Sequence, residues 1–229
     1  HVVPPRRPPK GFSYTRGNCS AFRKPFLDMR VEEIRQVWQK LKSLGPGSAS
    51  GSLSTGAGLS SDATKQALDG VAECINFDQV FLCGHSFGGA TVVRAAQDLP
   101  MMSADSTLGT MVLDMWPYCL PAEVTSAGLG IHTSLFLNSE PFATNSEAHI
   151  CKDLVKTSQA ALGLYLPGSV HGSFSDTPIV LPRWLGKLLR LTGQLDSDVA
   201  YSEIAGACLL FMDECRRGVR VPKKKKKKI

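Results

Sequence analysis

The sequence predicts an α/β fold in which a parallel sheet is flanked by helices, and three observations support this. Short apolar runs alternate with stretches of helical periodicity, as in sheets whose strands are linked by helices. The unbroken apolar run at 80–83 fits a central strand covered on both faces, and it leads through Ser86 into a helical stretch at 90–96. A chain of 229 residues is also long enough to bury the core of one such domain.

The segment around Ser86 has the form of a nucleophile elbow. Its residues Gly84-His85-Ser86-Phe87-Gly88 match the pattern Gly-x-Ser-x-Gly between a strand and a helix. A serine hydroxyl is a poor nucleophile until a tight turn exposes it beside a base, and the two glycines relieve the crowding of that turn. The N-terminus of the following helix favours an oxyanion near the Phe87 amide. We therefore expect Ser86 to be the nucleophile and Phe87 to provide a backbone oxyanion donor.

Candidate partners for this serine follow the ends of later strands. Asp114 and His171 each come just after an apolar run, at the edge where open α/β sheets bind ligands. The order serine, acid, histidine is that of the α/β hydrolases, in which His171 would take the proton of Ser86 and return it to the leaving group. Glu140 also follows a strand, so spacing alone leaves it equal to Asp114 as the acid. We expect His85 to point away from the site.

The chain divides into two basic ends and a folded body. Residues 1–27 are rich in Pro and Arg and predict an unstructured arm, residues 28–215 form a partial α/β-hydrolase domain, and residues 216–229 form a Lys-rich tail. Apart from the helix that follows Ser86, we expect helices from Asp28 to residue 44 and at 62–75, 146–158, 180–192 and 198–215, with strands at 80–83, 110–113, 133–137 and 162–166.

The net charge of +6 comes from the two ends. Residues 1–27 hold six basic residues and residues 216–229 hold nine, and neither segment holds an acid. The body holds 11 Lys and Arg against 20 Asp and Glu, so it is acidic and does not predict a nucleic-acid partner. The lysine run at 223–228 fits a solvated tail better than a targeting signal.

Cysteine usage and hydropathy exclude several other classes. The seven cysteines are odd in number and form no Cys-x-x-Cys pair, so they predict neither a disulfide framework nor a metal site. We expect neither a metal nor a cofactor. No apolar run is long enough to cross a bilayer, and no signal peptide or myristoylation start is visible in a chain that begins with His1. The sequence leaves the compartment open between a secreted and a cytoplasmic or peripheral-membrane protein.

Four motifs follow one another along the domain: GHSFGGAT at 84–91, LDMW at 113–116, FLNSE at 136–140 and GSVH at 168–171. Together they resemble the platelet-activating factor acetylhydrolase family, in its plasma and type II intracellular forms, over residues 62–215. The resemblance implies a serine-dependent, calcium-independent phospholipase A₂. Such an enzyme removes short or oxidised sn-2 acyl groups, as in platelet-activating factor, and releases lysophospholipid. In that family the acid is the aspartate of the Leu-Asp-x-Trp motif, here Asp114.

The resemblance also gives a meaning to the apolar segment 179–190, which carries basic residues along one side. In similar enzymes the helix after the catalytic histidine touches the lipid surface. We therefore expect peripheral contact with a membrane or lipoprotein surface, in addition to a phospholipid substrate, through Trp184, Leu185, Leu188 and Leu189. The alternative is an ordinary amphipathic helix packed on the sheet. The sequence does not set the oligomeric state.

The sequence departs from a complete hydrolase before residue 60. That region shows neither the upstream strands nor the His-Gly loop that supplies a second oxyanion amide. We therefore expect the C-terminal half of an α/β-hydrolase fold with its N-terminal strands missing, and weak activity or none for this chain alone. Two other function classes are another carboxylesterase or lipase that shares the fold, and a non-catalytic fragment.

Overall fold

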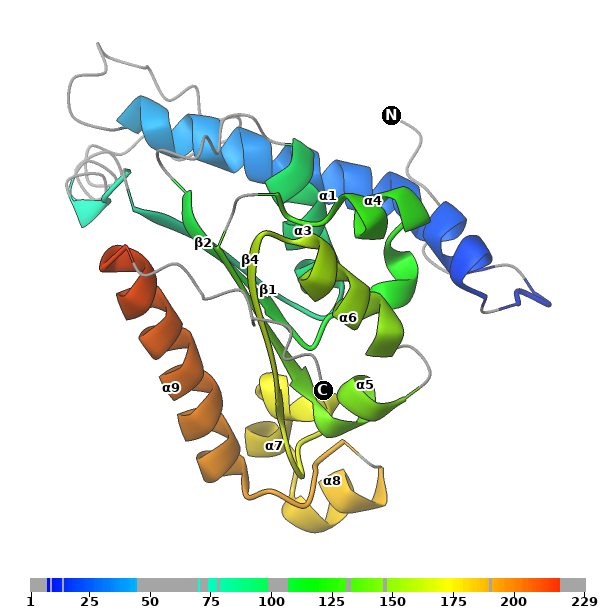
Figure 1. The fold of residues 1–229 in the computed structure, drawn as a ribbon. Coiled ribbons are helices and arrows are strands. Elements are labelled where there is room, and N and C mark those ends of the chain that lie inside the picture. The colour runs from blue at the N-terminus through cyan, green and yellow to red at the C-terminus, as the bar shows by residue number, and fades with distance from the viewer. Residues whose placement is uncertain are drawn as a thin grey trace, which may run out of the picture.

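A computed structural model gives the arrangement of the chain (Figure 1). It describes residues 8, 10–13, 15–44, 70, 74–77, 79–98, 107–130, 133–145, 148–189 and 191–218. Most of the helix predicted over 62–75 and the lysine run at 223–228 lie outside these residues.

Four parallel strands form one sheet in the order β1-β2-β3-β4. In the register of the sheet, His85 pairs with Leu113 and Leu113 pairs with Leu137, so the ends of three strands lie level with one another. This arrangement confirms the predicted parallel α/β fold. The strands are β1 (Val80–His85), β2 (Thr107–Leu113), β3 (Thr133–Ser139) and β4 (Ala160–Leu166).

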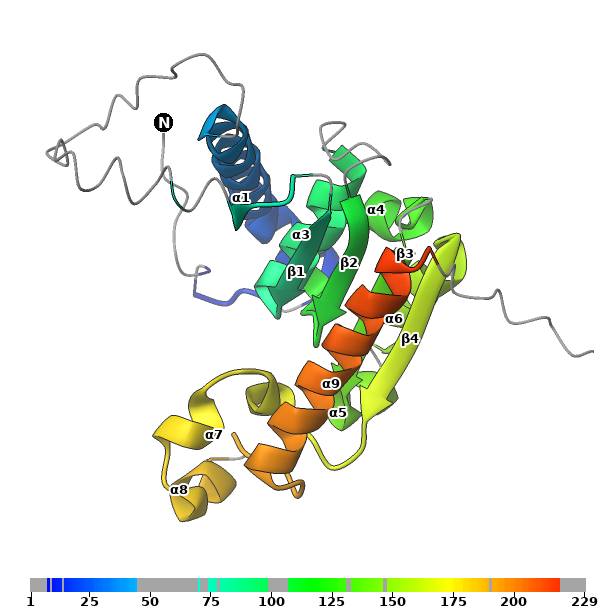
Figure 2. The same cartoon turned by 90° about the vertical axis from the view of Figure 1, so that its left-hand side faces the viewer.

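Helices cover both faces of the sheet (Figures 1 and 2). Val112 and Phe136 belong to a core shared with α1, α3 and α6, whereas Met111 and Leu135 pack against α9 on the opposite face. The side chains of β2 and β3 therefore alternate between two apolar layers. The helices are α1 (Arg16–Leu44), α3 (Phe87–Asp98), η1 (Pro117–Cys119), α4 (Ala122–Ala127), α5 (Glu140–Thr144), α6 (Ala148–Thr157), η2 (His171–Phe174), α7 (Thr177–Val180), α8 (Arg183–Leu188) and α9 (Ser197–Arg216).

Helix α1 begins at Arg16 and not at Asp28, so the prediction of an unstructured arm is wrong for residues 16–27. Cys19 and Leu27 are buried there, and the Arg16 guanidinium donates a hydrogen bond to the Thr125 hydroxyl at 2.7 Å. The Pro- and Arg-rich composition of this segment predicts disorder, but burial of its apolar side chains stabilises the helix.

The single helix predicted over 180–192 is replaced by α7 and α8. Pro182 lies between them and Leu181 is extended, with φ −94° and ψ 135°. Proline has no backbone N–H and disfavours the helical conformation of the residue before it, so the helix breaks at this position.

Strand β1 is less enclosed than the sequence predicts. Among the described strands it pairs with β2 alone, and it stands at one end of the strand order. Leu82 is buried whereas Cys83 is exposed, which contradicts the expectation of a strand covered on both faces. None of the helices in the described segments is long and apolar enough to cross a membrane.

Candidate active site

Ser86 occupies the sharp turn between β1 and α3, with a φ of 58°. A side chain on Gly84 would overlap the carbonyl of Gly88, and one on Gly89 would lie 3.1 Å from the Met115 Cβ. A Cβ on Gly88 itself would meet no atom within 4 Å. The turn therefore requires glycine at position 84, before the serine. After the serine, the position without room for a side chain is Gly89 and not Gly88.

Backbone hydrogen bonds fix this turn to the neighbouring strand. The Ser86 amide donates to the carbonyl of Leu113 at 3.1 Å, and the Ser86 carbonyl accepts from the Trp116 amide at 3.1 Å. Phe87 directly follows as the first residue of α3. Its role as an oxyanion donor stays a prediction.

Asp114 lies just past β2, with a φ of 40° and a fully buried side chain. Its backbone amide donates to the carbonyl of Leu137 at 2.8 Å. Its carboxylate accepts two hydrogen bonds from Ser139, one from the amide at 2.6 Å and one from the hydroxyl at 3.0 Å. The end of β3 thus holds the carboxylate in one orientation without contact with solvent.

His171 connects this carboxylate to the serine. Its Nδ1 lies 2.6 Å from Oδ2 of Asp114, and its Nε2 lies 2.9 Å from Oγ of Ser86. The His171 side chain is 40% exposed, so solvent reaches the middle of the three-residue chain although Asp114 is buried. The order carboxylate, imidazole, hydroxyl allows the imidazole to accept the hydroxyl proton.

Glu140, the alternative acid, has a different partner. Its Oε2 accepts a hydrogen bond from the Gly168 amide at 2.7 Å. Gly168 begins the loop that carries His171, and its carbonyl accepts from the Leu195 amide at 3.0 Å. The carboxylate of Glu140 therefore supports the loop of the histidine, while Asp114 contacts the histidine itself.

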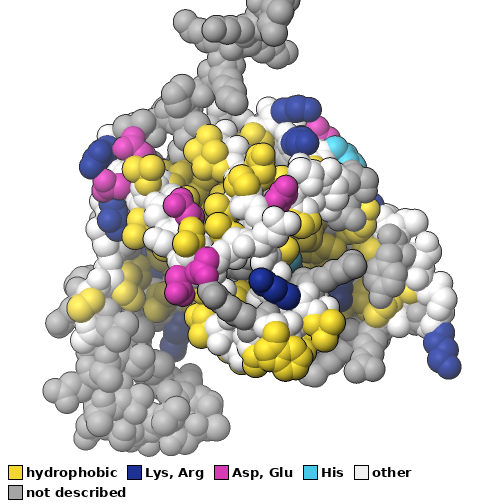
Figure 3. All heavy atoms as spheres, turned by 90° about the horizontal axis from the view of Figure 1, so that it is seen from below, with side chains coloured by type: hydrophobic (Ala, Val, Ile, Leu, Met, Phe, Trp, Pro, Cys, Tyr) yellow, Lys and Arg dark blue, Asp and Glu magenta, His cyan; other side chains and the backbone are white. Residues whose placement is uncertain are grey.

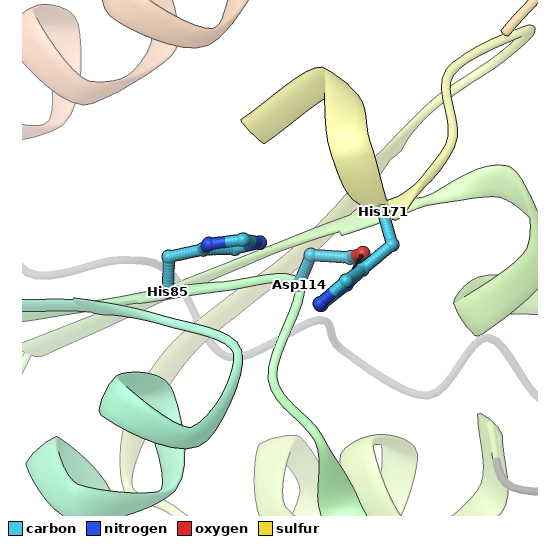
Figure 4. Close-up of side chains that lie close together, drawn as sticks. All are labelled: His85, Asp114 and His171. Carbon is cyan, nitrogen blue, oxygen red and sulfur yellow. Dashed lines mark hydrogen bonds and ion pairs between the residues drawn. The ribbon is translucent and has the colours of Figure 1, made fainter. Parts of the chain in front are cut away.

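The expectation that His85 points away from the site is wrong. Figure 4 shows its ring directed toward Asp114 and His171, and its centroid lies 4.6 Å from that of His171. Burial, followed by the nearby His171 charge, lowers the pKa of His85. Its Nε2 is buried and has no hydrogen-bond partner among the described residues.

Two aromatic rings complete the surroundings of the imidazoles. Phe142 lies 5.1 Å from His171, and Phe174 stacks on His85 at 6.0 Å, both measured between ring centroids. Sequence reasoning missed both phenylalanines. The only available signal was proximity in the chain, because Phe142 follows Glu140 by two residues and Phe174 follows His171 by three.

His85, Asp114 and His171 also form a group that could hold a metal ion. Their ligand atoms all lie within 4.8 Å of one another, and the described residues contain no other such group. Asp114 and His171 are already joined by their 2.6 Å contact, and Ser86 lies against the other imidazole nitrogen. This hydrogen-bonded order suits proton transfer from a hydroxyl.

The residues predicted to face lipid lie on and beside α8. Trp184, Leu188 and Leu189 are 69%, 71% and 52% exposed, whereas Leu185 is half-buried. Figure 3 views the molecule from the side of α7 and α8 and shows apolar side chains gathered there. Contact of these residues with lipid stays a prediction. Leu185 is the least accessible of the four, because its side chain is partly buried.

Comparison with known proteins identifies the family. Residues 13–223 match the family model described as platelet-activating factor acetylhydrolase, isoform II. A platelet-activating factor acetylhydrolase of Cavia porcellus is 27% identical over 209 residues, which cover 84% of this chain and 41% of that protein. The corresponding protein of Bos taurus is 32% identical over 144 residues, which cover 62% of this chain and 30% of that protein.

A solved structure shares the fold. The ferulic acid esterase of Streptomyces cinnamoneus aligns with a TM-score of 0.58 at 18% identity, over 93% of this chain and 54% of that chain. This likeness shows the α/β-hydrolase fold, and the chain spans less than half the length of the two acetylhydrolases it matches. Because the family model matches most of its residues, the chain belongs to the platelet-activating factor acetylhydrolase, isoform II, family.

Proposed function

We propose that the chain carries the catalytic residues of a serine hydrolase that acts on phospholipids. Its substrates are phospholipids with a short or oxidised sn-2 acyl group, such as platelet-activating factor, and its products are a lysophospholipid and a carboxylic acid such as acetate. The observation that carries the proposal is the hydrogen-bonded chain from Ser86 Oγ through His171 to Asp114, at 2.9 and 2.6 Å. Membership of the family supports a lipid ester as the substrate.

The reaction proceeds in two halves. Ser86 Oγ attacks the sn-2 carbonyl as its proton passes to Nε2 of His171, and the Phe87 amide stabilises the oxyanion. The glycerol oxygen then leaves with the proton from His171, so that lysophospholipid departs and Ser86 is acylated. A water molecule gives a proton to His171 and attacks this ester, and the acid leaves as Ser86 recovers its proton. Asp114 stabilises the imidazolium in each half.

The groups that activate the nucleophile, transfer protons and stabilise charge in these steps are side chains or amides of the protein. Two hydrogen bonds from Ser139 hold the Asp114 carboxylate against the imidazole, so the group that stabilises the imidazolium is positioned by the fold itself. We therefore propose that the reaction is calcium-independent, with the expected result that a calcium chelator leaves the rate unchanged.

The surface around α8 supports peripheral contact with a lipid surface. Trp184, Leu188 and Leu189 are exposed there, and Ile179 and Val180 of α7 add two further exposed apolar side chains. An apolar surface of this kind rests in the interfacial layer of a membrane or lipoprotein without crossing it. Leu185 on the same helix is half-buried and offers less apolar area to such a layer.

The experiment uses a fluorophosphonate probe on the full 229-residue chain. Ser86→Ala should abolish labelling, whereas Ser202→Ala, at an exposed position of α9, should leave it intact. Circular dichroism confirms that each protein is folded. Absence of labelling in the folded chain would contradict the proposal and favour a non-catalytic role.

An assay of acyl-chain length then separates the two enzymatic alternatives. The proposal predicts faster release of acetyl than of long sn-2 chains from glycerophosphocholine substrates. Equal cleavage of simple carboxylic esters without any advantage from the phospholipid headgroup would indicate a general carboxylesterase.

A further inference from the structure

Helix α1 brings one arginine against the nucleophile turn. The guanidinium carbon of Arg23 lies 5.9 Å from the ring centroid of Phe87 and 5.3 Å from that of Trp116. Phe87 follows Ser86 in the chain, and the Trp116 amide donates to the Ser86 carbonyl. A permanently charged group therefore lies against the side chains of two residues that are joined to the nucleophile through the backbone, Phe87 by the chain and Trp116 by a hydrogen bond.

Aromatic rings also surround this guanidinium on its own helix. The Arg23 guanidinium carbon lies 5.4 Å from the centroid of Phe22 and 5.6 Å from that of Phe26. Ring faces attract the cation through its charge, but they accept few hydrogen bonds in the guanidinium plane. The contacts thus position the group and leave its in-plane N–H donors available.

Those donors have no acceptor among the described residues. Arg23 is half-buried, and neither a hydrogen bond nor an ion pair joins its guanidinium to that part of the chain. The acids closest to Arg23 and to Trp116 in the sequence have other partners, because Asp28 pairs with Lys24 at 2.6 Å and Asp114 is held by Ser139 and His171. A half-buried guanidinium whose donors have no acceptor among the described residues is available to bind an anion that the protein itself does not supply.

We propose that Arg23 binds the phosphate of the substrate headgroup and so selects phospholipids over neutral esters. The proposal rests on the function given above and names the group that recognises its substrate. A guanidinium offers a planar pair of donors that matches two phosphate oxygens, and the rings around Arg23 hold its charge in place. In a phospholipid the phosphate is borne by the glycerol carbon next to the one that carries the sn-2 ester, so its binding site must lie near Ser86.

The ligand is the phosphate and not the choline of the headgroup. Four rings around a cation resemble a site for a quaternary ammonium group, but Arg23 already supplies the positive charge at their centre. A second cation would be repelled there, whereas a phosphate oxygen is attracted by the charge and by the open donors.

The kinetic test compares two esters in the full-length chain: 1-alkyl-2-acetyl-glycerophosphocholine and p-nitrophenyl acetate, which has no phosphate. In Arg23→Gln, the ratio of kcat/KM for the phospholipid to kcat/KM for the neutral ester should fall at least ~10-fold, mainly through KM, since a charge-assisted hydrogen bond is lost. Lys24→Gln is the matched control and should leave the ratio unchanged. An equal fall for both esters, or no change in the ratio, overturns the proposal.

A binding test does not depend on activity. We would titrate glycerophosphocholine into Ser86→Ala and follow the heat of binding, with Arg23→Gln and Arg23→Lys added in the same background. The proposal predicts at least ~10-fold weaker binding for the glutamine variant and a partial loss for lysine, which keeps the charge but lacks the planar fork. Circular dichroism confirms folding, and the lysine variant carries the test if the glutamine variant does not fold.

The outcomes separate this proposal from the proposed function. Absence of glycerophosphocholine binding overturns the phosphate site, even if the fluorophosphonate probe labels Ser86. Inorganic phosphate that binds as tightly as glycerophosphocholine also overturns it, because the site would then serve the free anion. Arg23-dependent binding of glycerophosphocholine without any labelling would support the phosphate site and contradict the hydrolase.

Discussion

Ser139 donates two hydrogen bonds to the buried carboxylate of Asp114, at 2.6 Å from its amide and 3.0 Å from its hydroxyl. Ser139→Ala removes only the second bond and leaves part of a buried charge without its donor. We expect a loss of about 1–3 kcal/mol in the free energy of unfolding and slower labelling by the fluorophosphonate probe. Urea titration and labelling rates measure both effects. If Ser139→Ala behaves like the exposed control Ser202→Ala, the hydroxyl has no such role.

The two candidate acids are separated by a pair of amide substitutions. Asp114→Asn keeps the shape of the side chain but no longer stabilises an imidazolium on His171, so labelling should slow by roughly 10⁴-fold. Glu140→Gln retains a carbonyl oxygen that accepts from the Gly168 amide and should keep most of the rate. Labelling rates of the two variants decide the assignment. A larger loss for Glu140→Gln than for Asp114→Asn would reverse it.

Alanine substitution of the two glycines around Ser86 should change the free energy of unfolding in different ways. Gly84→Ala places a Cβ onto the Gly88 carbonyl and should destabilise the fold by about 1–3 kcal/mol or more. Gly88→Ala meets open space within α3 and should be neutral or stabilising by up to about 1 kcal/mol, because alanine favours the helix. Urea titration of both variants measures the difference. Similar losses would show that the turn is not packed as described.

The lowered pKa of His85 predicts a pH dependence of stability. Burial keeps the imidazole neutral in the folded protein, so the unfolded chain binds the additional proton. Stability should fall as the pH drops below 6.5, the ordinary pKa of histidine, toward the lowered pKa of His85 in the folded protein, and it should be retained above 6.5. His85→Phe should flatten this dependence in unfolding measured at pH 7.5 and 5.5, while His149→Phe on α6 should not. An unchanged profile in His85→Phe would contradict the buried neutral imidazole.

Two pairs of exposed leucines test which surface meets lipid. Replacing Leu188 and Leu189 by serine removes apolar area from the α8 surface and should weaken binding to phospholipid vesicles, as measured by flotation. Leu209 and Leu210 on α9 are similarly exposed and provide the matched control. If the α9 pair lowers vesicle binding and the α8 pair does not, the lipid-facing surface lies on α9.

Local patterns in the sequence were sufficient for the sheet and for the contact between Ser86 and His171, and they left Asp114 and Glu140 as alternative acids. Each strand is a short apolar run, and parallel strands bring their following residues to one edge whatever lies between them. Asp114 could be chosen over Glu140 only through resemblance, because the difference lies in which partner each carboxylate reaches. Glu140 bonds to an amide 28 residues away, a contact that spacing does not reveal.

Other features depend on packing between distant segments. The order of residues 16–27 comes from burial of Cys19 and Leu27, which a Pro- and Arg-rich composition conceals. The direction of His85 is set by the rings of His171 and Phe174, which lie more than 80 residues away in the chain. Only the break at Pro182 had a local signal, since proline lacks a backbone N–H and disfavours the helical conformation of the residue before it, although Pro25 is accommodated inside α1.

Because β1 stands at one end of the described sheet, the contact between Ser86 and His171 is expected to open more often than the contact between His171 and Asp114. Among the described strands, β2 is paired on both sides, whereas β1, like β4, is paired on one, so we expect β1 to separate from β2 more readily than β2 separates from β3. Separation of β1 from β2 would move the Ser86 hydroxyl away from the His171 imidazole, while Asp114 would keep both hydrogen bonds from Ser139. Asp114 then keeps its position while Ser86 moves. The fraction of time in which all three side chains are hydrogen-bonded depends on how often β1 is paired with β2.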